Sequence, residues 1–136
     1  MIFDFPNPTV TKTIRVPLTN AVVVGQGSLL CGDPATGLLV AAASADDTMI
    51  PIGFAARDYI GDGTTAVEVE LFRPLWLYTF LNDASSNVAK VFAPVYVKDY
   101  QTVQADGTGK ALLGFALGRS TTQVLVAVGP ELTLTS

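Results

Sequence analysis

Apolar and polar residues alternate along several short segments of the chain, whereas no segment shows a sustained helical stripe. The clearest alternation runs from Ala66 to Phe72, where every second residue from Val67 onward is valine or leucine and the residues between include two glutamates. A period of two is typical of a strand with one buried face. Further segments rich in β-branched and aromatic residues, bounded by Gly, Pro, Asp or Asn, are Asn20–Asp33, Thr64–Leu81, Phe92–Asp99 and Thr121–Thr135.

Turn-forming residues separate these segments and leave little room for helix. The pairs Asp62-Gly63 and Asp106-Gly107 suit turns that need a positive φ. Helical signal is confined to Ala45–Ile50 and Asp83–Phe92, each long enough for a turn or a short helix. We therefore predict an all-β fold, either a small β-barrel or a sandwich, with little helix.

A Gly-Phe-Ala motif occurs twice, at Gly53–Ala55 and again at Gly114–Ala116. Each copy is followed by Thr-Thr-x-Val, a strand segment and a proline, and each is preceded by a short apolar segment that ends in aspartate. Two such units are too long for a solenoid repeat and too few for a propeller, but they fit an internally duplicated sandwich or barrel. We predict a single β domain over residues 14–136, with degenerate halves at about 22–74 and 88–130.

The repeated motif has a catalytic and a structural interpretation, and we favour the structural one. Gly53 and Gly114 are expected to serve the backbone, as a bulge or a point of close approach at the start of a strand. Phe54 and Phe115 are expected to fill the core beside these corners.

The first thirteen residues differ in character from the rest of the chain. Two prolines each remove a backbone donor and disfavour helix at the preceding residue, so the segment should be extended. It also carries large apolar side chains. Two interpretations stay open: an arm, residues 1–13, that packs on another molecule, and an arm folded back on its own domain. Its candidate contact residues are Ile2, Phe3, Phe5, Pro6 and Pro8.

Composition narrows the range of partners. Of 136 residues, 49% are apolar and 15% are charged, with a net charge of −4. This excludes disorder and suggests that another chain covers some apolar surface. The eight Lys and Arg residues are scattered singly, which argues against nucleic-acid binding. Apolar runs fall well short of the ~20 residues of a membrane-spanning helix, so we expect no membrane partner.

Two further features bear on the compartment. The N-terminal segment lacks a basic region followed by an apolar one, so we expect the chain to stay in the cytoplasm of the cell that makes it, without secretion. Cys31 is the one cysteine, and its leucine neighbours favour a buried, inert thiol.

Catalytic chemistry has little support in the residues. The chain has no histidine, which removes the commonest general base and the commonest transition-metal ligand. One cysteine cannot build a structural zinc site. The triplets at 62–64 and 106–108 read Asp-Gly-Thr, unlike the Asp-Thr-Gly of aspartic proteases, and they lie at non-equivalent places in the repeat. We therefore expect no enzymatic activity, no metal site and no cofactor.

An aromatic ladder remains as a candidate binding feature. Trp76, Tyr78 and Phe80 alternate along one strand segment and are expected to share a face. Such a ladder serves as core packing, as a protein contact or as a platform for stacking sugars. No polar cluster lies beside it in the sequence, which favours the first two roles. A carbohydrate-binding or host-recognition module is the alternative that uses the third.

The order of these segments resembles the small decoration, or cement, proteins of tailed-bacteriophage capsids. The likeness rests on VVVGQGSLLCGD at 22–33, on LLVAAASADDTMIPIGFA at 38–55, and on FAPVYVKD and GKALLGFALGRSTTQVLVAVGP between residues 92 and 130. It is a pattern of small residues and strands with no invariant chemical signature.

The resemblance implies a non-enzymatic virion structural protein that binds the exterior of an assembled capsid and stabilises it. Its partners would be the major capsid protein and further copies of itself, with a trimer expected. In several such proteins an N-terminal arm contributes to capsid binding or neighbour contact. The candidate contact residues are therefore those of the arm together with Trp76 and Tyr78.

Overall fold

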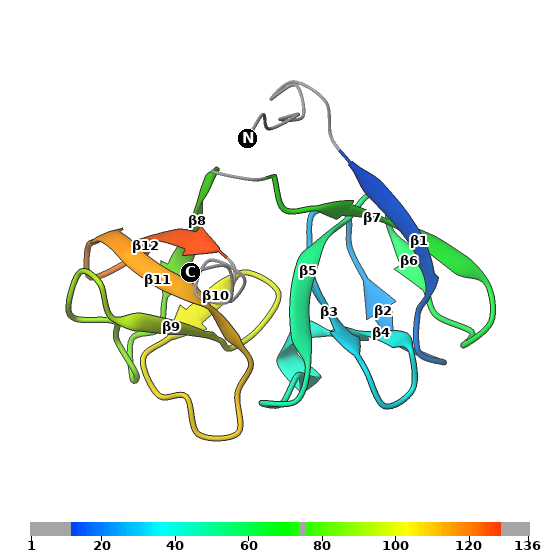
Figure 1. The fold of residues 1–136 in the computed structure, drawn as a ribbon, viewed down its shortest axis with the longest axis horizontal. Coiled ribbons are helices and arrows are strands. Elements are labelled where there is room, and N and C mark those ends of the chain that lie inside the picture. The colour runs from blue at the N-terminus through cyan, green and yellow to red at the C-terminus, as the bar shows by residue number, and fades with distance from the viewer. Residues whose placement is uncertain (1–11, 74–75, 129–136) are drawn as a thin grey trace, which may run out of the picture.

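The computed structural model describes residues 12–73 and 76–128, and these form an all-β structure, as the sequence predicts (Figure 1). A short 3₁₀ turn, η1 (Ala42–Ser44), follows the fourth strand. The strands are β1 (Thr13–Pro17), β2 (Val23–Val24), β3 (Leu29–Asp33), β4 (Leu38–Ala41), β5 (Ile50–Ala55), β6 (Tyr59–Ile60), β7 (Ala66–Leu71), β8 (Leu77–Asn82), β9 (Pro94–Val97), β10 (Thr102–Gln104), β11 (Leu112–Arg119) and β12 (Gln123–Val128).

The strands form two five-stranded units, one in each half of the chain. In the first half the sheet order is β1-β7-β5-β3-β4, and a parallel bridge between Leu18 and Leu39 brings the end of β1 beside β4. In the second half β10, β8, β12, β11 and β9 form a closed barrel. The short strands β2 and β6 make a separate ribbon in the first half. We call the two units the first barrel (13–71), whose edge strands are joined by the Leu18–Leu39 bridge alone, and the second barrel (77–128).

The two barrels share one strand order, so each main strand of the first has an equivalent in the second. Strands β1, β3, β4, β5 and β7 correspond to β8, β9, β10, β11 and β12. The registers agree down to a β-bulge that falls immediately before each Gly-Phe-Ala motif, at Ile52 in β5 and at Leu113 in β11. The internal duplication therefore involves whole barrels.

Each half of the repeat begins one strand earlier in the structure than the sequence indicates. β1 lies antiparallel to β7 in the same register in which β8 lies antiparallel to β12. The halves therefore begin at Thr13 and Leu77 rather than near residues 22 and 88. The strands TIRVP and LYTFLN share no identical residue at equivalent positions, so only their pairing reveals the relationship.

Both corner glycines are points of close backbone approach. A Cβ atom on Gly53 would lie 2.0 Å from the carbonyl oxygen of Glu70, and one on Gly114 would lie 2.0 Å from that of Ala127. A gap this small admits no side chain, so β7 and β12 can pass these corners only because glycine stands there. The structure thus assigns each glycine a backbone role.

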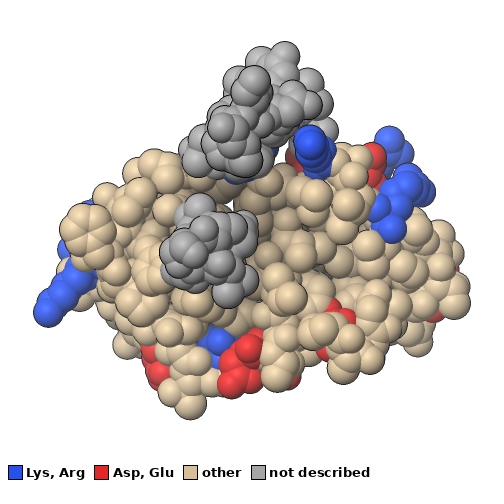
Figure 2. Space-filling view, in the orientation of Figure 1, with Lys and Arg blue, Asp and Glu red and all other residues tan. Residues whose placement is uncertain are grey.

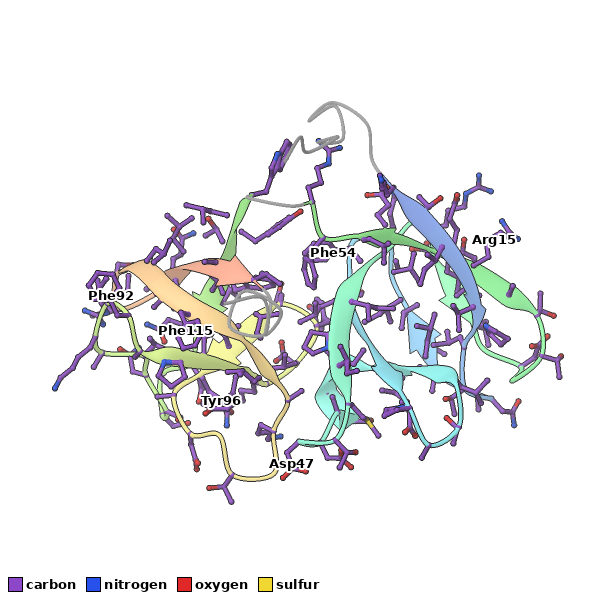
Figure 3. The ribbon with its side chains drawn as sticks, in the orientation of Figure 1. Arg15, Asp47, Phe54, Phe92, Tyr96 and Phe115 are labelled. Carbon is purple, nitrogen blue, oxygen red and sulfur yellow. The ribbon has the colours of Figure 1, made fainter. Side chains whose placement is uncertain are left out.

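The two phenylalanines lie on the outer faces of their barrels, because the alanine that follows each of them packs inside. This differs from the expectation that both rings fill the core beside the corner. Phe54 packs between the barrels, with its ring centroid 5.2 Å from that of Phe72 and 5.5 Å from that of Tyr78. Phe115 is partly exposed on the second barrel (Figure 3).

The interior of the second barrel and the outer wall of the first form one continuous core. Three consecutive residues of β3 are fully buried, because Leu30 packs inside the first barrel while Leu29 and Cys31 join the core of the second. Burial raises the pKa of the Cys31 thiol to about 12. The thiol is therefore unreactive at neutral pH, as its apolar neighbours indicate.

The close approach at the corners predicts a large difference between two glycine substitutions. Gly53→Ala should lower the free energy of unfolding by about 3 kcal/mol, because the added methyl group meets backbone atoms that cannot move aside. At Gly32 the nearest atom to an added Cβ is 3.9 Å away, so Gly32→Ala should change stability by less than about 1 kcal/mol. Denaturant titration of both variants measures the difference, and equal stabilities would contradict the assignment.

Candidate contact surfaces

Most of the predicted arm lies outside the described residues, including its candidate contact residues Ile2, Phe3, Phe5, Pro6 and Pro8. Its last two residues are described. The carbonyl of Lys12 accepts a hydrogen bond from the N–H of Leu71 (2.9 Å), and Thr13 begins β1. The arm therefore leaves the first barrel beside the end of β7, where the linker to the second barrel starts (Figure 1).

The three rings of the predicted ladder have different environments. Phe80 is 5% exposed and belongs to the core. The hydroxyl of Tyr78 accepts a hydrogen bond from the N–H of Arg73 (2.8 Å), and its ring packs on Phe54. Trp76 precedes β8 and is 42% exposed, with the guanidinium of Arg73 4.2 Å from its ring centroid. Only one ring of the three is therefore largely open to a ligand or partner.

The outer surface of β8 and β12 carries no charge, and four of its six side chains are apolar. Two of its leucines, Leu77 and Leu81, are 44% and 42% exposed. We call it the β8–β12 surface, made of Leu77, Thr79, Leu81, Gln123, Leu125 and Ala127.

The equivalent surface of the first barrel is charged. Its outward positions on β1 and β7 include Arg15, Glu68 and Glu70, and Arg15 lies opposite Glu68 in the register. Figure 2 shows charged side chains beside β1, whereas those on the second barrel lie at its left and lower edges. Because the backbone is the same at both places, the difference reflects what each surface faces rather than what the fold requires.

Phe92 is an exposed aromatic residue on an unfavourable backbone. It has a φ of 73° and is 76% exposed, at the far end of the second barrel from the first (Figure 3). The equivalent residue in the first barrel is Gly27, with a φ of 82°. Both donate an N–H hydrogen bond to the alanine carbonyl of the neighbouring Gly-Phe-Ala motif, Ala116 and Ala55 respectively. Placing phenylalanine in a conformation suited to glycine costs about 1–2 kcal/mol.

A buried polar network holds the loop that leads to Phe92. The side-chain amide of Asn82 donates to the carbonyls of Val88 and Ser120, and its oxygen accepts the N–H of Val88 (2.8 Å). The guanidinium of Arg119 donates to Val88 and to the side chain of Asn87. The loop therefore presents Phe92 from a fixed position, with a hydrogen-bonded framework on the side away from solvent.

Five aspartates stabilise turns. Asp33, Asp46, Asp62, Asp99 and Asp106 each accept the N–H of the residue two positions ahead. In the first Asp-Gly-Thr triplet the glycine has a positive φ, as expected for such a turn. In the second the positive φ falls on Gly109 instead.

Gly107 has a different reason to be glycine. A Cβ atom there would lie 2.4 Å from the ring of Tyr96, so the aromatic ring packs directly on the backbone.

Within residues 12–73 and 76–128, no group of three acidic or cysteine side chains is placed to hold a metal ion.

Comparison of the chain with family models, with curated proteins and with solved structures returns no match. Among the described residues, no helix has the length and apolar character needed to cross a membrane.

The turn carboxylates predict how stability changes with pH. The hydroxyl and N–H of Thr65 and the N–H of Thr64 donate hydrogen bonds to Asp62. These bonds hold the pKa of Asp62 well below its usual range. Lys98 similarly lowers the pKa of Asp83. Because these values are depressed in the folded state, the stabilisation is complete above the unfolded pKa of about 3.9 and is lost as pH falls through the folded values.

We therefore expect the free energy of unfolding, measured by denaturant titration, to decrease from pH 5 to pH 3. Asp62→Asn keeps an acceptor oxygen but removes the charge, so its decrease over this range should be smaller. A variant with the wild-type pH dependence would show that Asp62 contributes nothing to it.

Proposed function

We propose that the chain is a capsid decoration protein: a non-enzymatic virion structural protein that binds the outer surface of a phage capsid and stabilises it. The observation that carries the proposal is the uncharged β8–β12 surface, whose counterpart on the first barrel bears Arg15, Glu68 and Glu70. A partner that covers the apolar surface explains why one of two equivalent barrels lacks the charge of the other.

The position at which the arm starts supports a contact on the same side of the molecule as the β8–β12 surface. Lys12 is hydrogen-bonded to Leu71, and the linker that carries Arg73 and Trp76 follows two residues later. Leu77, the first residue of the β8–β12 surface, comes directly after Trp76. An arm that starts here, an exposed indole and an apolar strand surface together form a continuous contact region for the major capsid protein.

Association among copies adds to this binding. An oligomer that engages several capsid subunits converts weak single contacts into tight attachment, because each further contact is intramolecular. We propose a homo-oligomer, with a trimer expected, located on the capsid exterior. The alternative of a sugar-binding module has less support, because Phe80 is buried and Tyr78 packs on Phe54. Those two rings offer no stacking platform.

The first test places a charge at equivalent positions of the two barrels. Leu125→Lys should weaken binding to expanded shells of the major capsid protein by at least ~10-fold, because burying an unpaired charge is unfavourable. Glu68→Lys, its counterpart on β7, lies away from the arm and should bind as the wild type does. Co-sedimentation with shells measures both. Lack of binding by the full-length chain, or a gene neighbourhood without a major capsid protein, would refute the proposed function.

The second test removes the arm without disturbing β1. Deletion of residues 2–11 retains Lys12, whose carbonyl bonds to Leu71, so the barrels should keep the wild-type melting temperature to within a few degrees. Binding to shells should fall by at least ~10-fold, because ordered arm residues add contact area. A truncated chain that binds with unchanged affinity would remove the arm from the contact region.

A further inference from the structure

The two barrels of one chain meet through unlike surfaces. The mouth of a barrel is the end at its β3–β4 turn in the first barrel and at its β9–β10 turn in the second. The wall is the outer face of β3 and β5 in the first barrel, and of β9 and β11 in the second. The mouth of the second barrel packs on the wall of the first, and their residues form one buried cluster. From the mouth come Phe80, Val97, Val103, Ala111 and Leu113, and from the wall come Leu29 and Cys31, with the partly buried Phe54 packed against the cluster.

A backbone hydrogen bond fixes this contact. The N–H of Leu29, on the wall of the first barrel, donates to the carbonyl of Tyr100 in the β9–β10 turn (3.1 Å). The contact leaves every mouth residue of the second barrel at most 5% exposed. A mouth that meets a wall is therefore an effective way for this fold to bury its open end.

The mouth of the first barrel has no such cover within the described chain. Ile50 is 51% exposed, whereas its equivalent Ala111 is fully buried. Val16 and Gly32 replace the larger Phe80 and Val97 of the second barrel. The result is an apolar hollow of about 210 Å³, lined by Val16, Gly32, Leu38, Leu39, Ile50 and Ile52, with Asp33 at its edge.

Within the described residues, the wall of the second barrel is only partly covered, by Gly107, which packs on the ring of Tyr96. Pro94, Tyr96 and Phe115 occupy the positions of Leu29, Cys31 and Phe54, and all three retain exposed surface. Figure 3 shows Tyr96 and Phe115 on the second barrel. Lys110 takes the place of Met49, which packs in the internal contact. Asp33 of the hollow and Lys110 beside the free wall carry opposite charges, which favours their pairing.

We infer that the mouth of the first barrel binds the wall of the second barrel of another copy of this chain. The occupant is a second copy because the chain already makes this contact internally, between surfaces at the same positions of the same fold. The contact is head-to-tail, so it joins copies into a closed ring or an open chain according to its rotation. The inference stands independently of capsid binding.

One feature of the internal contact does not recur between copies. Pro94 has no N–H, so it cannot repeat the hydrogen bond that Leu29 donates. The same substitution leaves no unpaired donor on the open wall of a free subunit. The contact between copies therefore depends on apolar burial and on the flanking charges.

The test uses two variants that damage opposite surfaces. Ile50→Asp leaves the wall intact and Pro94→Asp leaves the mouth intact, and both positions are exposed. Sedimentation velocity over a concentration series should show the wild type associating, and each variant alone should dissociate at least ~10-fold more readily. An equimolar mixture should form a one-to-one dimer, because one intact mouth meets one intact wall. Ile60→Asp, at a site 75% exposed outside both surfaces, should associate as the wild type does.

Circular dichroism and thermal unfolding confirm that each variant is folded before the mixing experiment. A wild type that stays monomeric at all concentrations overturns the inference, as does association that Ile50→Asp leaves unchanged. Variants that dissociate alone but do not pair on mixing overturn the head-to-tail arrangement. Because the capsid test uses Leu125 and Glu68, failure of either proposal is seen separately.

Discussion

The close passage of one strand over a glycine is the constraint on which both barrels depend. A five-stranded barrel is narrow, so its strands must bend sharply to close, and bulges and glycines are the usual means. Here the bulge at Ile52 or Leu113 is followed at once by Gly53 or Gly114, with a carbonyl 2.0 Å from the place of a Cβ atom. The same device at the same position closes each unit, and the strands on either side take their registers from it.

The duplication supplies an internal comparison for every exposed position. Where the two barrels differ at equivalent sites, the backbone cannot be the cause. Leu77 stands where the first barrel has Thr13, and Phe92 stands where it has Gly27. Each replacement exposes an apolar side chain, and Phe92 also takes on backbone strain. Such changes are unfavourable for an isolated subunit, and they are the reason why we propose that other chains cover these surfaces.

The buried polar groups serve architecture. Asn82 bonds to both backbone groups of Val88, and the equivalent residue in the first barrel is the fully buried Leu18. The aspartates are bound into turns by neighbouring N–H groups. This use of carboxylates lowers the pKa of Asp62 and Asp83 and keeps them ionised. A catalytic acid needs the opposite environment, one that raises its pKa towards neutrality.

The sequence by itself determined the all-β class, the duplication and the roles of Gly53 and Gly114, because alternation and special glycines are local properties of the chain. Cys31 could also be placed in the core from its neighbours. The tertiary structure alone decided that β1 and β8 belong to the repeat, since their equivalence lies in hydrogen-bond register and not in residue identity. It also separated Trp76 from Tyr78 and Phe80, and turned Phe54 and Phe115 outward. Which side of a strand meets another barrel depends on how the two units pack against each other. The period-two pattern of a single strand cannot predict this packing.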